Sequence, residues 1–175
     1  YVDYEKIYLS RYKLLRKAYE KADLKTDPDY AEFLKEEKDW LQDYCLFMAI
    51  KNDQKGICWI DWPEELKDRH SKAVKEAEKE LAEEIEFYRF QQYCFTTQWR
   101  KLKAYANKKD ISIIGDVPIY VALDSSDAWA NPEMLQFDEA YNPKAVAGCP
   151  PDAFSATGQL WGNPLYDWKA LKKDG

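Results

Sequence analysis

The stretch Ile111-Ser-Ile-Ile-Gly-Asp116 decides the predicted fold of this 175-residue chain. It begins with a short, nearly continuous run of β-branched residues, which is typical of a parallel strand buried on both faces. It follows a long helical pattern and ends at a glycine and an aspartate. A long helix, a short turn, a buried strand and an acidic residue at the carboxyl end of that strand are typical of an α/β barrel or an open α/β sheet. In a barrel, the loops that follow the strand ends build the active site, so the position of Asp116 makes it a candidate functional residue.

The residues before this strand predict helices. Up to Asp110 the chain has one glycine and two prolines, whereas five glycines and six prolines follow. We expect a helix over about residues 3–22 and a second helical region over about 28–52, in one piece or two, that ends before Gly56.

Two further helices are predicted before the strand. Asp61 can cap a short helix that carries Pro63 in its first turn, where a missing N–H costs little. Residues 71–107 carry apolar side chains at steps of three and four, which predicts one long helix with one apolar face. Aromatic residues crowd the later half of this helix, so we expect that half to pack on more than one side, as core and not as a ligand site.

Composition excludes several classes of function. The 26 basic and 32 acidic side chains give a net charge of −6 and a pI near 5.0, which argues against nucleic acid as a partner. No apolar run approaches the ~18 residues of a membrane span, and the first twenty residues carry eight charges, which does not fit a signal peptide. The expected location is therefore the cytoplasm.

The cysteines and the single histidine disfavour the catalytic sites that depend on these residues. We therefore expect catalysis by carboxylates. The four cysteines, Cys45, Cys58, Cys94 and Cys149, lack C-x-x-C spacing and are predicted to be reduced and mostly buried. The single histidine, His70, lies in a charged run and is predicted to be a solvated residue at a helix end. One histidine disfavours a zinc site or a Ser-His-Asp arrangement, and we predict neither a metal nor a cofactor.

A second unusual stretch is Ala145-Val-Ala-Gly-Cys-Pro-Pro-Asp-Ala-Phe-Ser-Ala-Thr-Gly-Gln-Leu-Trp-Gly-Asn-Pro-Leu-Tyr-Asp-Trp168. Its glycines and prolines break any helix or long strand, so it cannot be interpreted as ordinary secondary structure. Its aromatic rings lie beside carboxamides, hydroxyls and a carboxylate, a mixture that suits a sugar with apolar ring faces and hydroxyls at its edges. A surface loop with a few buried aromatics is an equally good interpretation of composition alone.

A resemblance decides between these interpretations. Three motifs carry it: Gly115-Asp-Val-Pro-Ile-Tyr-Val-Ala122, Asp124-Ser-Ser-Asp-Ala-Trp-Ala-Asn-Pro-Glu133 and Pro150-Pro-Asp-Ala-Phe-Ser-Ala-Thr-Gly-Gln-Leu-Trp-Gly-Asn-Pro-Leu-Tyr166. With them the chain closely resembles the bacterial 4-alpha-glucanotransferases, also called amylomaltases or disproportionating enzymes, which are relatives of the alpha-amylases. The helical segments around residues 40–50 and 87–99 are similar as well, so the resemblance covers essentially the whole chain.

The resemblance implies a (β/α)₈ TIM barrel with a mostly helical inserted subdomain, an enzyme of the α/β class. Such an enzyme moves α-1,4-glucan segments between maltooligosaccharides by a retaining double displacement, which needs a carboxylate nucleophile and a second carboxyl group as acid and base. The family motifs for these two groups do not occur after Trp168. We therefore expect an internal fragment with an incomplete barrel, predominantly α-helical and inactive by itself. Its expected parts are a helical subdomain over residues 1–107 and a barrel strand plus substrate-binding loop over residues 108–175.

The resemblance also implies roles for individual residues. Asp116 matches an aspartate that supports the catalytic centre and is not the nucleophile. Gln159 and Trp161 match the glycan-contacting Gln-x-Trp of the family. Further substrate-binding candidates are Asp152, Phe154 and Ser155 in a loop that covers bound glucan, together with Asn163 and Tyr120. The implied partners are a maltooligosaccharide or α-glucan and the rest of the parent enzyme's barrel.

Three alternatives stay open on the sequence. One is a non-catalytic α-glucan-binding module that uses Trp161 and Phe154 as platforms. Another is a fragment of an alpha-amylase-type hydrolase. The third is a helical interaction protein whose long helix docks a partner through an exposed apolar face.

Overall fold

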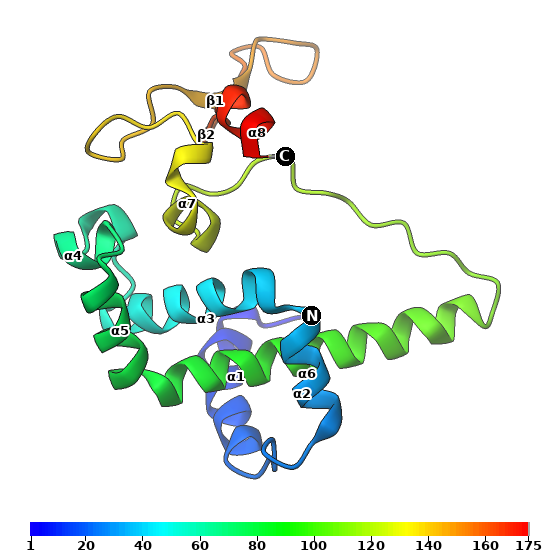
Figure 1. Ribbon diagram of the computed structural model, residues 1–175. Helices are drawn as coiled ribbons and strands as arrows, with labels where there is room; N and C mark the ends of the chain where they lie inside the picture. The colour runs from blue at the N-terminus through cyan, green and yellow to red at the C-terminus, as the bar shows by residue number, and fades with distance from the viewer. Residues whose placement is uncertain (175) are drawn as a thin grey trace.

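The structure, a computed structural model, describes residues 1–174 and consists of two helix-containing regions joined by an extended segment (Figure 1). Helices α1 to α6 form the first region. The second contains α7, the strands β1 and β2, and α8, close to the C-terminus. No helix among the described residues is long and apolar enough to cross a membrane.

The first three helices agree with the sequence prediction. Helix α1 spans Tyr4–Tyr19 and is capped by Asp3, whose carboxylate accepts a hydrogen bond from the Lys6 N–H at 2.9 Å. Helices α2, Pro28–Glu36, and α3, Lys38–Asp53, are the two pieces of the second helical region. They are separated at Glu37, whose φ of −100° and ψ of 11° interrupt the helical path.

The predicted cap at Asp61 is wrong. Asp61 ends a 3₁₀ turn, η1, over Trp59–Asp61, in which its own N–H donates to the Cys58 carbonyl. Trp62 is extended, and the short helix α4 starts two residues later, over Glu64–Lys67, with Pro63 at its cap and no side-chain cap. Asp61 lies two residues before the cap position of α4, too early to reach the first N–H groups of this helix.

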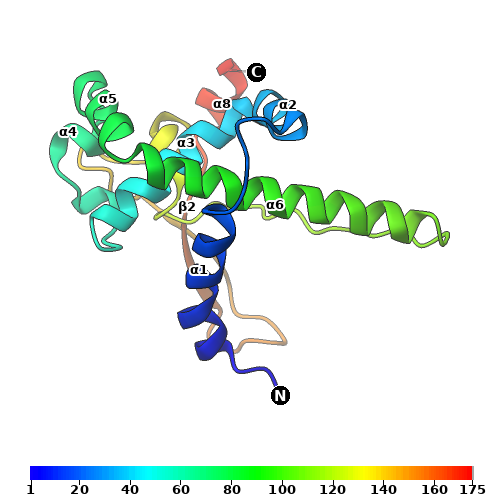
Figure 2. The same ribbon diagram turned by 90° about the horizontal axis from the view of Figure 1, so that it is seen from below.

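The predicted single helix over 71–107 is two helices. Helix α5 spans Ser71–Glu80 and α6 spans Ala82–Asn107. At Leu81 the backbone leaves the helical region, with φ −102° and ψ 18°, and the two helices point in different directions (Figures 1 and 2). His70 is exposed immediately before α5, as predicted.

The far half of α6 is not packed on several sides. Its first half packs on α3 and α1, with Ile85 and Phe87 buried. The far half projects beyond the other helices (Figure 2), and there the Phe95 side chain is 63% exposed and Leu102 is 54% exposed. The prediction of packing on more than one side is therefore wrong for this end of the helix.

The predicted buried strand is absent. Residues 111–118 have no regular secondary structure and run as an extended chain from the end of α6 to the second region (Figure 1). Ile114 is 94% exposed. A strand requires neighbouring strands to pair its N–H and C=O groups, and none lies beside this segment among the described residues.

The second unusual stretch of the sequence, residues 145–168, contains a β-hairpin. Strand β1, Val146–Cys149, pairs antiparallel with β2, Gln159–Pro164, and the short helix α8 follows over Trp168–Asp174. The expectation of no ordinary secondary structure is thus wrong for these two strands. Gly148 is required where the strands approach, since a Cβ there would lie 2.5 Å from the Gln159 carbonyl oxygen.

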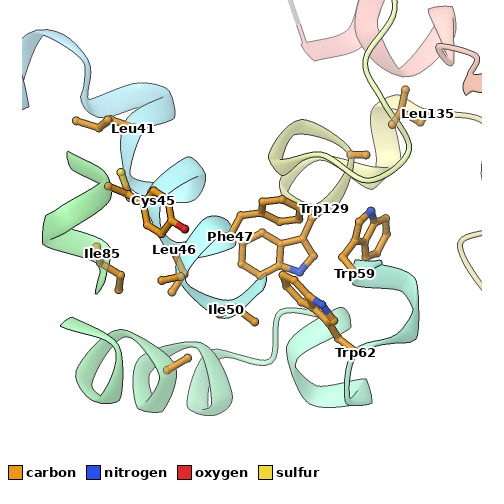
Figure 3. Close-up of a cluster of buried hydrophobic side chains, with 14 of the residues drawn as sticks. Leu41, Cys45, Leu46, Phe47, Ile50, Trp59, Trp62, Ile85, Trp129 and Leu135 are labelled. Atoms are coloured by element: carbon orange, nitrogen blue, oxygen red, sulfur yellow. The ribbon is translucent and has the colours of Figure 1, made fainter. Parts of the chain in front are cut away.

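One aromatic core holds the second region on the first (Figure 3). Trp129 of α7, Ser126–Ala130, is fully buried between Phe47 of α3 and Trp62. Its indole N–H donates to the Leu66 carbonyl at 3.0 Å, and the Trp59 indole donates to the carbonyl of Leu123 at 2.7 Å. The chain after the extended segment therefore folds back onto α3 and η1.

None of the four cysteines forms a disulfide, and the prediction that they are mostly buried holds fully for one of them. Cys45 alone is fully buried, and the other three are partly buried. Burial raises the pKa of the Cys45 thiol to about 12, so this thiol stays protonated and unreactive at neutral pH.

Candidate functional site

The loop that joins the two strands, residues 150–158, is closed by its own hydrogen bonds. One carboxylate oxygen of Asp152 accepts from the N–H groups of Phe154 and Ser155, both at 2.8 Å. The Ser155 hydroxyl donates to the Gly158 carbonyl at 2.7 Å. Gly158 itself has φ +74°, and a Cβ there would lie 2.5 Å from the Cys149 carbonyl oxygen. The loop therefore has a defined shape that its own sequence fixes.

Phe154 lies in this loop with its ring in solvent. It is 96% exposed, and no ring contact involves it among the described residues. The hydrogen bond from its N–H to Asp152 fixes the backbone and leaves the side chain outward. A large apolar ring held out on a fixed loop is available to cover a ligand on the hairpin.

Gln159 and Trp161 lie two residues apart on β2, which places their side chains on the same face of the strand. The Trp161 indole N–H donates to the Gln159 side-chain oxygen at 2.9 Å. This bond fixes the plane of an indole that is still 50% exposed. The amide NH₂ of Gln159 keeps its donors available, since no hydrogen bond from it is formed within the described part of the chain.

Tyr120 and Asn163 lie near this pair. Asn163 belongs to β2, whereas Tyr120 belongs to the segment before α7. The Tyr120 ring lies 6.2 Å from Trp161, and it stacks on Tyr166 at 6.2 Å with an interplanar angle of 13°. The Asn163 amide donates to the Val121 carbonyl at 2.9 Å, which ties β2 to the segment that carries Tyr120. The structure thus brings Gln159, Trp161, Tyr120 and Asn163 together.

Tyr166 is the member of this cluster that the candidate residues from the sequence did not include. Its half-buried ring stacks on Tyr120, and its backbone carbonyl accepts from the Gln136 amide at 2.9 Å. The available signal was its place at the end of the third motif, two residues beyond Pro164.

Asp116 lies outside the cluster. It is exposed in the extended segment, and no hydrogen bond or ion pair involves it within residues 1–174. The position predicted for it, at the carboxyl end of a strand, has no strand here. The described residues also contain no group of three His, Cys, Asp or Glu side chains that could hold a metal ion.

Comparison with known proteins gives consistent matches. A family model described as 4-alpha-glucanotransferase matches residues 1–175. The 4-alpha-glucanotransferase of Clostridium butyricum is 49% identical over 173 residues, which cover 98% of this chain and 36% of that protein. The 4-alpha-glucanotransferase of Thermus thermophilus is 46% identical over 178 residues, which cover 99% of this chain and 36% of that protein.

A solved structure, amylomaltase from Streptococcus agalactiae in complex with acarbose, matches with a TM-score of 0.91 and 40% identity. The match covers 99% of this chain and 35% of that one. The chain therefore spans about a third of the length of the relatives that it matches.

Proposed function

The chain belongs to the 4-alpha-glucanotransferase family, and we propose that it supplies the glucan-contacting hairpin of an enzyme that transfers α-1,4-glucan segments between maltooligosaccharides. The observation that carries this proposal is the pair Trp161 and Gln159, an exposed indole and an amide fixed against each other on one strand face. The matching structure was solved with acarbose bound, which supports an oligosaccharide as the ligand.

The pair provides the two contacts that a sugar requires. The exposed face of the Trp161 indole can lie against the apolar face of a glucose ring. The Gln159 amide can donate to the hydroxyl groups at the edge of that ring. Phe154, held outward on the closed loop, would cover the bound sugar and exclude water from it.

Asp152 and Ser155 serve this arrangement indirectly in our proposal. The hydrogen bonds of both side chains end on the backbone of their own loop. We therefore assign them the shaping of the loop that presents Phe154. Asn163, whose amide is bonded to Val121, would likewise hold the Tyr120 ring beside Trp161.

The reaction proposed for the whole enzyme is a retaining double displacement. A carboxylate forms a glycosyl-enzyme intermediate, and a second carboxyl group protonates the leaving sugar and then activates the acceptor hydroxyl. We assign neither role to a residue of this chain. Asp116 is proposed to support the catalytic centre from the segment that precedes the hairpin.

The proposed setting of the hairpin is a (β/α)₈ barrel. Residues 1–107 would form its helical subdomain, and residues 108–175 would contribute one barrel strand and the substrate loop. The exposure of Ile111 and Ile114 supports this proposal, because the apolar side chains of a barrel strand are covered only when neighbouring strands and helices are in place. The cytoplasm is the proposed compartment.

The alternatives are not favoured. The Clostridium butyricum and Thermus thermophilus relatives are both named as transferases, and neither name indicates an alpha-amylase-type hydrolase or a non-catalytic binding module. The matches also run over nearly the whole chain, including the helices that an interaction protein would use.

Titration with maltoheptaose, followed by tryptophan fluorescence, tests the proposed contact. We expect binding in the micromolar to millimolar range, or about −4 to −8 kcal/mol. Trp161→Ala is expected to abolish the fluorescence change and weaken binding at least tenfold. Trp99→Ala is the matched control, since Trp99 is 40% exposed on the far half of α6. Equal losses in the two variants, or an unchanged affinity in Trp161→Ala, would contradict the assignment.

A further inference from the structure

Gln136 follows the 3₁₀ turn η2, Pro132–Met134, and both its backbone and its side chain form hydrogen bonds to the chain that follows β2. We propose that Gln136 is a positioning residue, which holds the Trp161 ring in place through Tyr166 and Tyr120 and so sets how tightly the hairpin holds a glucan. The inference rests on the proposed function, and it concerns a residue that does not itself contact the sugar.

The backbone at this position forms a short antiparallel bridge with the chain after β2. Leu135 lies opposite Tyr166. A backbone hydrogen bond of 2.8 Å closes the bridge on either side, from the Gln136 N–H to the Leu165 carbonyl and from the Asp167 N–H to the Met134 carbonyl. Two residues that lie opposite each other between such bonds exchange none themselves. The bridge therefore supplies no donor to the carbonyl of Tyr166.

The side chain of Gln136 supplies that donor. Its amide NH₂ donates to the Tyr166 carbonyl at 2.9 Å in partly buried surroundings. No backbone N–H donates to this oxygen within residues 1–174. Loss of the amide would leave a partly buried carbonyl without a protein partner, which is unfavourable. The bond thus restrains the backbone at Tyr166 and, with it, the direction in which the tyrosine ring leaves the chain.

The ring of Tyr166 carries this restraint to the indole. It stacks on the Tyr120 ring with an interplanar angle of 13°, and the Tyr120 ring lies 6.2 Å from that of Trp161. Tyr120 belongs to a segment without helix or strand, so ring contacts contribute much of what fixes its position. A displaced Tyr166 ring would therefore free Tyr120 to move away from the indole.

The surroundings of Gln136 separate this role from a contribution to the core. Its neighbours Leu135 and Phe137 are buried core residues, only 6% and 9% exposed. Gln136 itself lies between them and is partly buried. Its backbone bond to Leu165 does not involve the side chain. Replacement of the amide therefore leaves the core and the bridge in place and removes only the bond to Tyr166.

Gln136→Met tests the hydrogen bond, because methionine has a similar length and no donor. We expect maltoheptaose, titrated with tryptophan fluorescence as the readout, to bind this variant about three- to tenfold more weakly than the wild type, the effect of one lost hydrogen bond. Gln91→Met is the matched control, since the Gln91 amide donates to the Phe87 carbonyl within α6. The control should bind maltoheptaose as the wild type does, and urea unfolding checks that both variants are folded.

Gln136→Lys tests rescue by a different donor. The lysine ammonium can donate to the Tyr166 carbonyl in place of the amide. We expect this variant to recover most of the affinity that Gln136→Met loses. A residue that only filled space would not distinguish a donor from a thioether of similar length.

The indole N–H of Trp161 gives a readout without ligand. In ¹⁵N-labelled protein, its NMR signal is identified by its absence from Trp161→Phe. We expect this signal to shift in Gln136→Met, because the Tyr120 ring moves relative to the indole, and to stay in place in Gln91→Met.

The outcomes separate this inference from the proposed function. Binding that depends on Trp161 but is unchanged in Gln136→Met would overturn the positioning role and leave the hairpin assignment in place. Equal losses in Gln136→Met and Gln91→Met, a Gln136→Lys variant no better than Gln136→Met, or an unmoved indole signal would also overturn it. A wild-type chain that does not respond to maltoheptaose would overturn both proposals.

Discussion

At the scale of single residues, Asn163 shows why the composition of a loop is easier to predict than its contacts. The sequence placed this amide among the sugar-binding candidates, but in the structure its donor is bonded to the Val121 carbonyl, 42 positions away along the chain. The residue types in the loop follow directly from the sequence, and their mixture of aromatic rings and amides led to the prediction of a sugar site. The partner of each side chain depends on long-range folding, which one sequence does not encode in any local pattern.

Asp27 gives a prediction about pH. It caps α2, and the Tyr93 hydroxyl of α6 donates to its carboxylate at 2.8 Å, which lowers the pKa of Asp27 below the ordinary 3.8. A carboxyl group whose pKa is lowered in the folded state stabilises that state above the ordinary pKa, and the contribution disappears as the pH falls below it. Tyr93→Phe is therefore expected to lower the free energy of unfolding near neutral pH, and this difference from the wild type should shrink below about pH 4.

Urea unfolding at a series of pH values measures this difference. Tyr105→Phe is the control, because Tyr105 is a 64% exposed tyrosine on the same helix. A difference between the wild type and Tyr93→Phe that stays constant down to pH values well below the ordinary pKa of Asp27 would show that the hydrogen bond does not couple to its titration.

At the scale of elements, the sequence predicted the existence of the helices better than their limits. The break between α5 and α6 falls at Leu81, a good helix former with no proline or glycine nearby, so propensity could not reveal it. Leu81 packs against the core where the chain turns, and tertiary packing overrides the local preference. The prediction of a strand at Ile111–Ile114 was wrong for a related reason. A strand requires partner strands for its N–H and C=O groups, and local sequence does not supply them.

Helix α7 is short, and we expect its stability to come from Trp129. This side chain is fully buried against Phe47 and Trp62, and the Arg69 guanidinium lies 4.2 Å from its ring. Trp129→Ala is expected to cost about 3–5 kcal/mol of unfolding free energy, the usual effect of emptying a buried aromatic site.

Chemical denaturation measures the free energy of unfolding of Trp129→Ala and of the control Trp99→Ala. The control removes a partly exposed indole and should change this free energy by about 0.5 kcal/mol or less. Similar losses in the two variants would show that the core around Trp129 contributes little to stability.

At the scale of the whole molecule, a large apolar surface is left uncovered. It consists of the far half of α6 and the extended segment, with exposed side chains at Phe95, Leu102, Ile111, Ile114, Val117 and Ile119. Large apolar side chains exposed in such numbers indicate that these two segments are covered by another surface. In the proposed barrel, the rest of the parent enzyme would cover it.

This surface predicts self-association of the chain in dilute buffer. Light scattering is expected to show an average mass that rises with protein concentration, and the double substitution Phe95→Lys with Leu102→Lys should reduce that rise. Phe95 and Leu102 are seven residues apart in α6, so the two added charges lie on one face of the helix. A monomeric mass at every concentration would contradict the prediction.

The closed loop between the strands also has a kinetic consequence. Since Asp152 and Ser155 already fix the backbone around Phe154, the proposed glucan ligand would not have to order this loop, because the conformational entropy has been lost during folding. In the proposed complex, encounter would then proceed at a rate set by diffusion and orientation, while the lifetime of the complex would depend on the aromatic rings in contact with the sugar. Substitutions at Trp161 should therefore change mainly the rate of departure, and substitutions that open the loop should slow arrival.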